Sequence, residues 1–214
     1  MTSSAKSFSL PLVYKEKIAD ETYSFFFDRS SLSDVGWDFT PGQYVRLTLP
    51  HESDDRGTSR YFTLSSSPLQ KDILSITVKI LESSFKRTLF SLPIGYHAHF
   101  FGPMGWFLLP QDDLQEKVFI AGGIGVTPFH SLLLSLVDQQ LDKPITLFAS
   151  FPTPERVLFY ESLTKVSRKN KKIRVIYTLT KGNKEGWQGE LGRLSHSMLA
   201  THVPDFLQPV YYIV

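Results

Sequence analysis

The hydrophobic pattern of this 214-residue chain changes near Pro110, and that change limits the folds available to it. Before Pro110, short alternating or β-rich segments are separated by turn signals, which is typical of an antiparallel barrel or sandwich. After Pro110, continuous apolar runs alternate with helical segments, as in parallel strands that helices cover on both faces. The sequence therefore predicts two domains of different class, joined by a polar linker from Pro110 to Glu116.

We expect the first domain, residues 1–110, to be an antiparallel Greek-key β-barrel. Its predicted strands are Phe8–Val13, Thr22–Phe27, Gln43–Leu49, Tyr61–Ser65, Leu74–Ile80 and His97–Phe101. One short helix over Lys86–Leu92, stopped by Pro93, would plug an open end of the barrel.

We expect the second domain, residues 117–214, to be an α/β doubly wound parallel sheet. Its predicted strands are Val118–Ala121, Ile145–Ala149, Ile173–Thr178 and Val210–Val214, and its predicted helices are Pro128–Gln140, Glu155–Lys169 and Leu194–His202. Strand–helix–strand alternation of this kind implies right-handed crossovers.

Charge and composition exclude several classes of function. A net charge of +2 is too small to indicate a nucleic acid or an anionic membrane as partner. The absence of cysteine excludes disulfides, a thiolate nucleophile and a cysteine-bound iron–sulfur cluster within this chain. The chain starts without a signal-peptide pattern, and its most apolar helical run, Leu132–Val137, is far shorter than a membrane span. A cytoplasmic protein is the expectation.

A glycine loop follows the first parallel strand directly. Gly122, Gly123 and Gly125 let the backbone approach a phosphate without a Cβ in the way. Thr127 is a suitable N-cap and Pro128 a suitable first helical residue, so a helix is expected to start there and to direct its N–H groups at an anion. We therefore predict phosphate binding at this loop, although it departs from the usual Rossmann fingerprint.

Histidines offer little further chemistry. His97 and His99 alternate along a predicted strand, but two histidines without a third ligand rarely bind metal, so no metal site is expected. His130 lies in the first turn of the helix after the glycine loop. It could approach a cofactor phosphate, or it could be an exposed polar residue.

Taken in order, several motifs resemble the ferredoxin–NADP reductase superfamily, whose members join an N-terminal flavin barrel to a C-terminal nicotinamide domain. Arg60-Tyr61-Phe62-Thr63 is similar to the family's Arg-x-Tyr-Ser/Thr motif, and Pro41-Gly42-Gln43-Tyr44 resembles the strand before it. Gly102-Pro103-Met104-Gly105 is similar to the turn that ends the barrel, and Gly122 to Pro128 resembles the dinucleotide loop. The resemblance covers essentially the whole chain.

The resemblance assigns the Arg60–Pro68 stretch to an FAD site. Arg60 offers a planar charged fork suited to a pyrophosphate. The family pattern implies that Phe62 lies against the isoalloxazine ring and that Thr63, the catalytic residue, hydrogen-bonds its N5 edge. Phe62 replaces the family's tyrosine and keeps only the stacking surface. Without the other motifs, the stretch would read as a core strand with Arg60 as a surface cap.

A second FAD contact is implied where the short helix begins. Ser83, Ser84, Phe85 and Lys86 occupy the place of the family's Gly-x-x-Ser turn, with Ser83 in place of the glycine and Lys86 in place of the serine. A helix start with added cations can still bind a pyrophosphate.

The nicotinamide cofactor is left open between NADH and NADPH. Ser150 follows the second parallel strand, where the family places a ribose or phosphate contact, and no acidic residue stands there. Arg156, Lys181 or Lys184 could bind a 2′-phosphate, or could be ordinary surface charges. We favour NADH.

The resemblance implies a flavin-dependent oxidoreductase that passes a hydride from NAD(P)H to FAD N5 and electrons on to a ferredoxin, a flavodoxin or an oxygenase. In the family, the strand resembling Val210–Val214 runs into a Gly-Pro-Pro turn and a last helix, so we expect a truncation at Val214. The alternative is a non-catalytic flavin-binding electron-transfer or sensor module with an incomplete nicotinamide site. The oligomeric state is left open.

Overall fold

The computed structural model describes residues 4–50, 57–81, 83–110, 115–182 and 185–214. It divides into two compact units, Met1–Leu109 and Pro110–Val214, which are described separately below. Residues 111–114 of the predicted linker lie outside the described residues.

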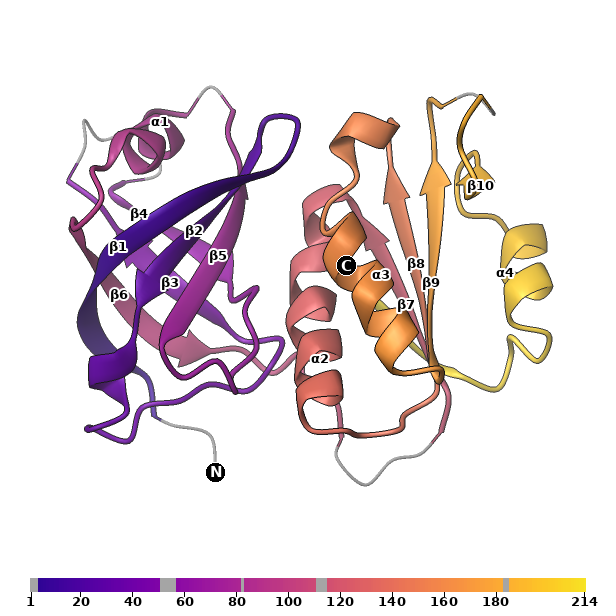
Figure 1. The fold of residues 1–214 in the computed structure, drawn as a ribbon, viewed down its shortest axis with the longest axis horizontal. Helices are drawn as coiled ribbons and strands as arrows, with labels where there is room; N and C mark the ends of the chain where they lie inside the picture. Colours follow the sequence, from indigo (N-terminus) through magenta and orange to yellow (C-terminus); the bar gives the residue numbers. More distant parts are fainter. Residues whose placement is uncertain (1–3, 51–56, 82, 111–114, 183–184) are drawn as a thin grey trace. The chain divides into compact units, whose positions relative to one another are not determined.

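The first unit is a curled antiparallel sheet of six strands in the order β4-β3-β6-β1-β2-β5 (Figure 1). The strands are β1 Lys6–Ala19, β2 Thr22–Asp28, β3 Tyr44–Thr48, β4 Ser59–Thr63, β5 Ile73–Lys79 and β6 His97–Met104. An isolated bridge between Leu64 and Ile76 brings the end of β4 back to β5. The predicted barrel is confirmed, although this single bridge stands where a closed barrel has a full ladder.

Strand β1 is long because its first part pairs with one strand and its second part pairs with another. Residues from Lys6 to Pro11 pair with β6, and those from Leu12 to Ala19 pair with β2. Its register with β2 shifts twice, between Leu12 and Tyr14 and between Lys17 and Ala19. Such irregularities bend a strand and increase its twist, so β1 can cross from one part of the curled sheet to the other.

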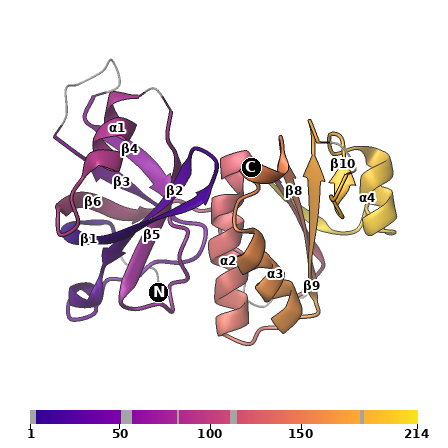
Figure 2. The same ribbon diagram turned by 45° about the horizontal axis from the view of Figure 1, so that its top comes forward.

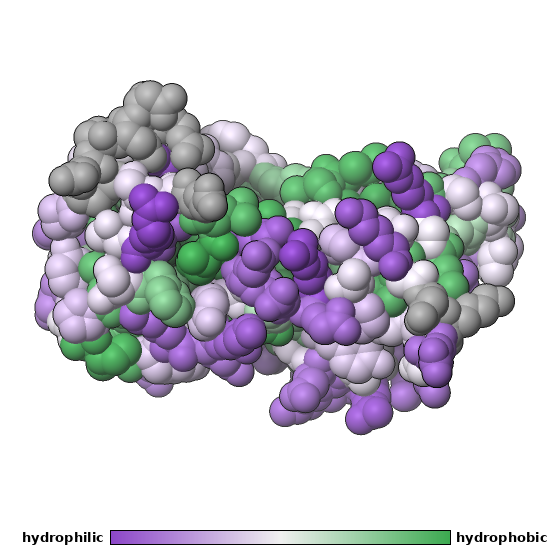
Figure 3. All heavy atoms as spheres, turned by 90° about the horizontal axis from the view of Figure 1, so that it is seen from above, coloured by the Kyte–Doolittle hydropathy of each residue, from purple (hydrophilic) through white to green (hydrophobic). Residues whose placement is uncertain are grey.

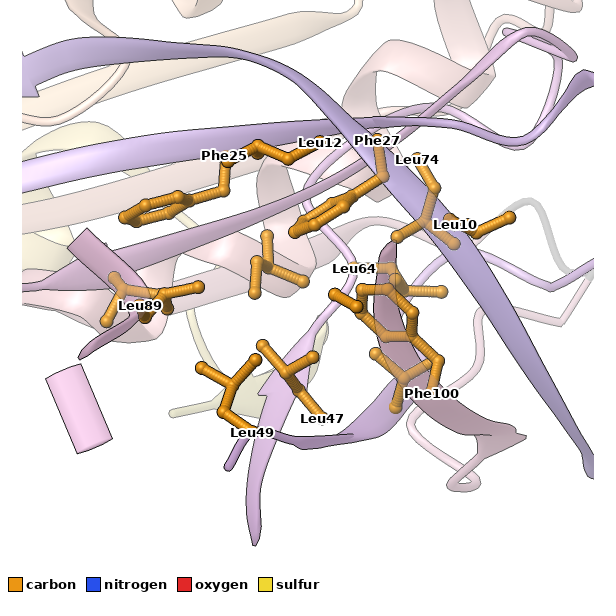
Figure 4. Close-up of a cluster of buried hydrophobic side chains, with 14 of the residues drawn as sticks. Leu10, Leu12, Phe25, Phe27, Leu47, Leu49, Leu64, Leu74, Leu89 and Phe100 are labelled. Atoms are coloured by element: carbon orange, nitrogen blue, oxygen red, sulfur yellow. The ribbon is translucent and has the colours of Figure 1, made fainter. Parts of the chain in front are cut away.

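The core of this unit is built from alternating apolar side chains. Leu10, Phe25, Leu47 and their neighbours are fully buried and point toward one another (Figure 4). Helix α1, Ser84–Ser91, adds Phe85 and Leu89 to this cluster. It begins two residues before the predicted Lys86, and it supplies the apolar plug that the sequence indicated.

A buried arginine organises the loops at one side of the barrel. Arg29 is 2% exposed, and its guanidinium donates to the carbonyls of Pro68 (2.7 Å) and Gln70 (3.1 Å). It also donates to Asp38 Oδ1 at 3.1 Å. Because every one of these partners lies in a loop, one side chain fixes segments that are far apart in the sequence.

The second unit is a five-stranded parallel sheet in the order β10-β9-β8-β7-β11, which confirms the doubly wound prediction. Its strands are β7 Lys117–Gly122, β8 Ile145–Phe151, β9 Ile173–Leu179, β10 Glu190–Leu191 and β11 Val210–Ile213. Its helices are α2 Val126–Asp138, α3 Tyr160–Lys169 and α4 His196–His202, with 3₁₀ turns η2 Gly123–Gly125 and η3 Pro154–Arg156.

Helices cover both faces of this sheet. Figures 1 and 2 show α2 and α3 on one face and α4 on the other. On the α4 face, Met198 and Val203 pack with Val118 and Phe148. The runs Val118–Ala121 and Ile145–Ala149 therefore lack polar alternation because apolar partners meet them from both sides.

The prediction of one continuous helix over Glu155–Lys169 is wrong, because the helix is interrupted. Pro154–Arg156 forms η3, and Phe159 adopts the left-handed conformation with φ 56° before α3 starts at Tyr160. Phe159 is buried and its ring stacks on His130 at 3.8 Å. Burial of this ring favours a break that helical periodicity alone does not indicate.

The surface is mixed, as the composition suggests. In Figure 3, hydrophilic and hydrophobic residues are interspersed on the face that is seen. None of the helices formed by the described residues is long and apolar enough to cross a membrane.

Replacing Arg29 with methionine should destabilise the chain by about 2 kcal/mol or more. The buried Pro68 carbonyl loses its donor, and an unsatisfied buried group costs about 1–3 kcal/mol. Urea denaturation measures the change. Arg46→Met, at an exposed position of β3, is the matched control and should shift stability by less than about 0.5 kcal/mol. Equal effects of the two variants would contradict the role of Arg29.

Stability should fall in acid in a way that depends on Asp38. Desolvation is the largest single influence and raises the pKa of Asp38, but hydrogen bonds from Lys71, the Phe39 N–H and Arg29 together lower the pKa below its ordinary 3.8. The unfolded chain therefore takes up the proton first as the pH falls. The contribution of Asp38 is complete above about pH 4 and is lost as the pH drops through the lowered pKa.

Urea denaturation midpoints, measured from about pH 4 downward, test whether Asp38 contributes to this loss of stability. Asp38→Asn should flatten the decline in stability. Asp20→Asn is the control, because Asp20 lies on the surface, where its ion pair with Lys17 has an N–O distance of 3.8 Å. An equal flattening by both variants would contradict the prediction.

Candidate flavin and nicotinamide sites

Strand β4 and the start of α1 meet through one buried ring. The guanidinium of Arg60 lies over the Phe85 ring, 5.2 Å from its centroid, and the ring of Phe62 lies 5.9 Å from the same centroid. Phe85 itself is fully buried in the first turn of α1. The structure thus brings together Arg60, Phe62 and the predicted helix start.

The orientation of Arg60 is held by the backbone. Its Nη1 donates to the carbonyls of Gly57 (2.8 Å) and Ser59 (2.7 Å). These two bonds hold the plane of the guanidinium fork against the backbone that leads into β4. Arg60 is half-buried.

The start of α1 has the properties of an anion site. Ser83 is the N-cap residue, and its carbonyl accepts the Arg87 N–H at 2.9 Å. Its Oγ is buried, yet it has no hydrogen-bond partner among the described residues. No acidic side chain lies in the first turn of α1, which carries Ser84, Phe85 and Lys86. Helix N–H groups, a cation and an unsatisfied hydroxyl together favour a phosphate ligand.

Tyr61 and Thr63 lie on the other face of β4, because successive strand side chains alternate. Tyr61 is 63% exposed and meets the Tyr44 ring edge-on, with centroids 5.8 Å apart. Thr63 is half-buried and ends the strand opposite Tyr44. Of the predicted flavin contacts, Arg60 and Phe62 therefore share a face with α1, and Tyr61 and Thr63 do not.

The serines after Thr63 are engaged inside the protein. Ser65 Oγ bonds to Ser75 Oγ (2.9 Å) and accepts from Thr77 Oγ1 (3.0 Å), while Ser66 Oγ accepts the Ser75 N–H (3.0 Å). These hydroxyls tie the end of β4 to β5. In the Arg60–Pro68 stretch, the residues of β4 are therefore partly exposed, whereas the serines that follow are buried and hold the fold together.

In the second unit, the glycine loop leaves β7 as a 3₁₀ turn. Gly122 ends the strand, Gly123–Gly125 form η2, and α2 begins at Val126. Gly123 has φ 53°, which favours glycine. A Cβ added at Gly122 or Gly123 would meet no atom within 4 Å, so the space beside their backbone is open.

The helix begins earlier than the sequence indicated, and Thr127 is not its N-cap. Gly125 holds that position, and Thr127 and Pro128 lie inside the first turn. The η2 turn already sets the helical path, so the threonine hydroxyl donates back to the Ile124 carbonyl at 3.0 Å. Pro128 is tolerated there because first-turn N–H groups have no partner within the helix.

Ser150 and Val214 flank this loop. Ser150 pairs in register with Gly122, so the ends of β7 and β8 lie at one edge of the sheet. The Gly122 N–H donates to the Val214 carbonyl at 3.2 Å, and a Cβ added at Gly125 would lie 3.0 Å from that oxygen. This edge is where open α/β sheets bind ligands.

His130 is not the exposed polar residue that one of its two interpretations expected. It is buried, its Nε2 lies 2.8 Å from Ser162 Oγ, and its ring stacks on Phe159. It is therefore a packing residue between α2 and α3, and it is not exposed. The tight α2–α3 packing that buries it has no sequence signal of its own.

The candidate basic residues for a 2′-phosphate lie beside the end of β8. Arg156 ends η3, and the Lys181 N–H donates to the Pro152 carbonyl at 2.9 Å. The loops that follow β8 and β9 are therefore joined. Lys184 lies outside the described residues.

Comparisons with known proteins match both units. Residues 9–108 match the oxidoreductase FAD-binding domain, and residues 119–213 match the oxidoreductase NAD-binding domain. The glycine betaine monooxygenase reductase subunit of Chromohalobacter salexigens is 30% identical over 174 residues, which cover 79% of this chain and 47% of the relative. The NADH-cytochrome b5 reductase 1 of Debaryomyces hansenii is 25% identical over 198 residues, covering 91% and 68%. The cytochrome P450 reductase GcoB of Amycolatopsis has a TM-score of 0.82 at 17% identity, covering 99% of this chain and 62% of that one.

The fold and the matched domains define a two-domain module for a flavin and a nicotinamide dinucleotide. The chain belongs to the oxidoreductases that combine an FAD-binding domain with an NAD-binding domain, which confirms the resemblance and both predicted cofactors, FAD and NAD(P)H. It spans about half the length of the C. salexigens relative, 47%.

Alanine at Gly122 and at Gly123 should have different effects on stability. At Gly122, with φ −108°, an added Cβ meets no atom within 4 Å, so stability should stay within about 0.5 kcal/mol. At Gly123 the left-handed backbone should cost about 1 kcal/mol. Chemical denaturation distinguishes the two variants, and equal costs would contradict the loop conformation.

Proposed function

We propose that this chain is the reductase module of an electron-transfer system, which passes a hydride from NAD(P)H to FAD N5 and electrons on to an acceptor. The observation that carries the proposal is the unsatisfied Ser83 hydroxyl at the start of α1, beside the β4 face that presents Arg60 and Phe62. These groups are of the type and arrangement that a pyrophosphate next to a flat ring requires.

In this proposal the first unit binds and orients the flavin. The pyrophosphate would be held by Arg60, Ser83, Ser84 and Lys86. The ring of Phe85 would support the guanidinium of Arg60, which lies over it. Phe62 would present its ring face to the isoalloxazine. Tyr61 and Thr63 lie on the other face of β4, so they would contact the flavin only where it passes the end of this strand, and there Thr63, as the catalytic residue, would donate to N5.

The second unit would hold the dinucleotide at the edge where β7 and β8 end. Gly122, Gly123 and Gly125, with the first-turn residues Thr127 and Pro128, would cradle its phosphates, and Ser150 would contact a ribose or phosphate oxygen. A bound flavin supplies the redox chemistry, since it accepts a hydride and releases electrons. The protein's part is orientation and charge, so no side-chain general base is required.

The acceptor is proposed to be a ferredoxin, a flavodoxin or an oxygenase component. The relatives include reductase components of glycine betaine and phenol monooxygenases and of a stachydrine demethylase. This chain has no cysteine, so a cysteine-bound cluster that received the electrons would have to lie outside it.

Arg60→Ala should weaken FAD retention on the order of 30-fold, because the loss of charge-assisted hydrogen bonds costs about 2 kcal/mol. Arg60→Lys, which keeps the charge and loses the fork, should have a smaller effect. Arg46→Ala on the neighbouring strand is the matched control, since Arg46 lies over Phe101 and away from α1. FAD titration by fluorescence measures all three. Unchanged affinity in Arg60→Ala would overturn the pyrophosphate assignment.

Anaerobic addition of NADH or NADPH to the FAD-loaded chain tests turnover. Bleaching of the yellow absorbance, faster with NADH, is the expected result. A yellow protein that neither nucleotide bleaches would identify a non-catalytic flavin module. A chain that cannot be reconstituted with FAD would exclude both functions.

A further inference from the structure

A cavity of about 560 Å³ lies at the free side of β9, within the second unit. It exists because β10 pairs only with Thr178 and Leu179, so the earlier part of β9 has no strand on that side among the described residues. Its lining includes Tyr160, Thr164, Tyr177, Trp187, Glu190 and His202. The lining shares no residue with the glycine loop or with Ser150, and its volume is typical of a small-molecule pocket.

One polar group in this cavity lacks a partner. Tyr177 is 7% exposed, and its buried hydroxyl makes no hydrogen bond to any described residue. Thr164 lies near enough to act on the Tyr177 hydroxyl, but not in a hydrogen-bonding geometry. Burial, and then the neighbouring Tyr160, raise the pKa of Tyr177 far above its ordinary value, with Thr164 opposing them. The hydroxyl is therefore neutral and available as a donor.

Aromatic rings form the walls around this donor. The Tyr160 centroid lies 5.1 Å from that of Tyr177, and the Trp187 ring lies 6.5 Å away and nearly perpendicular, at 76°. Tyr160 is 50% exposed and Tyr177 is 7% exposed, so the aromatic lining extends from the surface into the interior.

Four other polar residues of the lining already have partners. Trp187 Nε1 donates to the Glu190 carbonyl at 3.0 Å, and the Glu190 carboxylate lies 2.7 Å from His202 Nε2. The Ser167 hydroxyl donates to the Leu163 carbonyl at 3.3 Å. The Tyr177 hydroxyl is the buried polar atom of this lining that has no partner among the described residues.

We propose that this cavity binds a small, uncharged, planar aromatic molecule that carries a hydrogen-bond acceptor, at a site separate from those of the flavin and the dinucleotide. The ring packs against Tyr160 and Trp187, and the acceptor receives the Tyr177 hydroxyl. Offset and edge-to-face ring contacts favour a flat aromatic over a saturated ring. A buried donor without a partner costs stability that only a bound acceptor recovers.

A comparison of thermal stabilities tests whether the Tyr177 hydroxyl lacks a hydrogen-bond partner in the folded chain. Tyr177→Phe removes a group without a partner, so the thermal midpoint of the full chain should be unchanged or a few degrees higher. Tyr211→Phe is the matched control in the same unit, because the Tyr211 hydroxyl donates to the Phe206 carbonyl and its loss should lower the midpoint. If both variants lowered the midpoint equally, the Tyr177 hydroxyl would be a structural hydrogen-bond donor and the proposal would be overturned.

A binding experiment tests the ligand class. Saturation-transfer NMR on the full chain would compare acetophenone, which has a ring and an acceptor, with cyclohexyl methyl ketone, which lacks the aromatic ring. Acetophenone should bind more tightly, and Tyr177→Phe should weaken it about fivefold, while Tyr211→Phe should not. Failure of acetophenone to bind, equal binding of the two ketones, or displacement by NADH would overturn the proposal.

Discussion

The first unit depends on the burial of Phe85. Its ring belongs to the barrel core, but Arg60 and Phe62 on β4 also rest against it. Because protein interiors are close-packed, the ring cannot move without disturbing the core, so the separation between β4 and the start of α1 is fixed by hydrophobic packing. Two chemically different surfaces, a charged strand face and a helix N-terminus, are thereby held together.

The second unit positions its loop by a different means. β7 has β8 on one side and β11 on the other, and most of its side chains are buried. The strand that carries the glycine loop is thus held from both sides, while Gly122 and Gly123 keep open space beside them. A rigid strand that ends in an open loop suits an anion, because bringing the loop into place costs no ordering at the moment of binding.

Sequence patterns predicted the strands well because burial acts on them directly. Alternation indicated the barrel strands and unbroken apolar runs indicated β7 and β8, but β1 continues past its predicted end at Val13 to Ala19, and the short strand β10 was not predicted. The errors in the predicted helix boundaries have a common physical cause, because tertiary contacts set the local backbone geometry there. Thr127 has the chemistry of an N-cap, but the η2 turn starts the helix earlier. The break at Phe159 goes with its stack on His130, a contact between residues 29 positions apart that no periodicity encodes.

The motifs indicated which residues to consider at the flavin site, but not which of them face one another. Alternation along β4 separates Tyr61 and Thr63 from Arg60 and Phe62, and the serines that follow turn inward to β5. Nor did the sequence distinguish Ser83 or Tyr177 from other hydroxyl residues, because satisfaction of a hydroxyl is a property of its surroundings. Both are buried without partners among the described residues, at a cost that folding alone does not recover. A buried polar group that lacks a partner lowers stability, and such groups are expected mainly at functional sites. These two hydroxyls mark one candidate site of this kind in each unit.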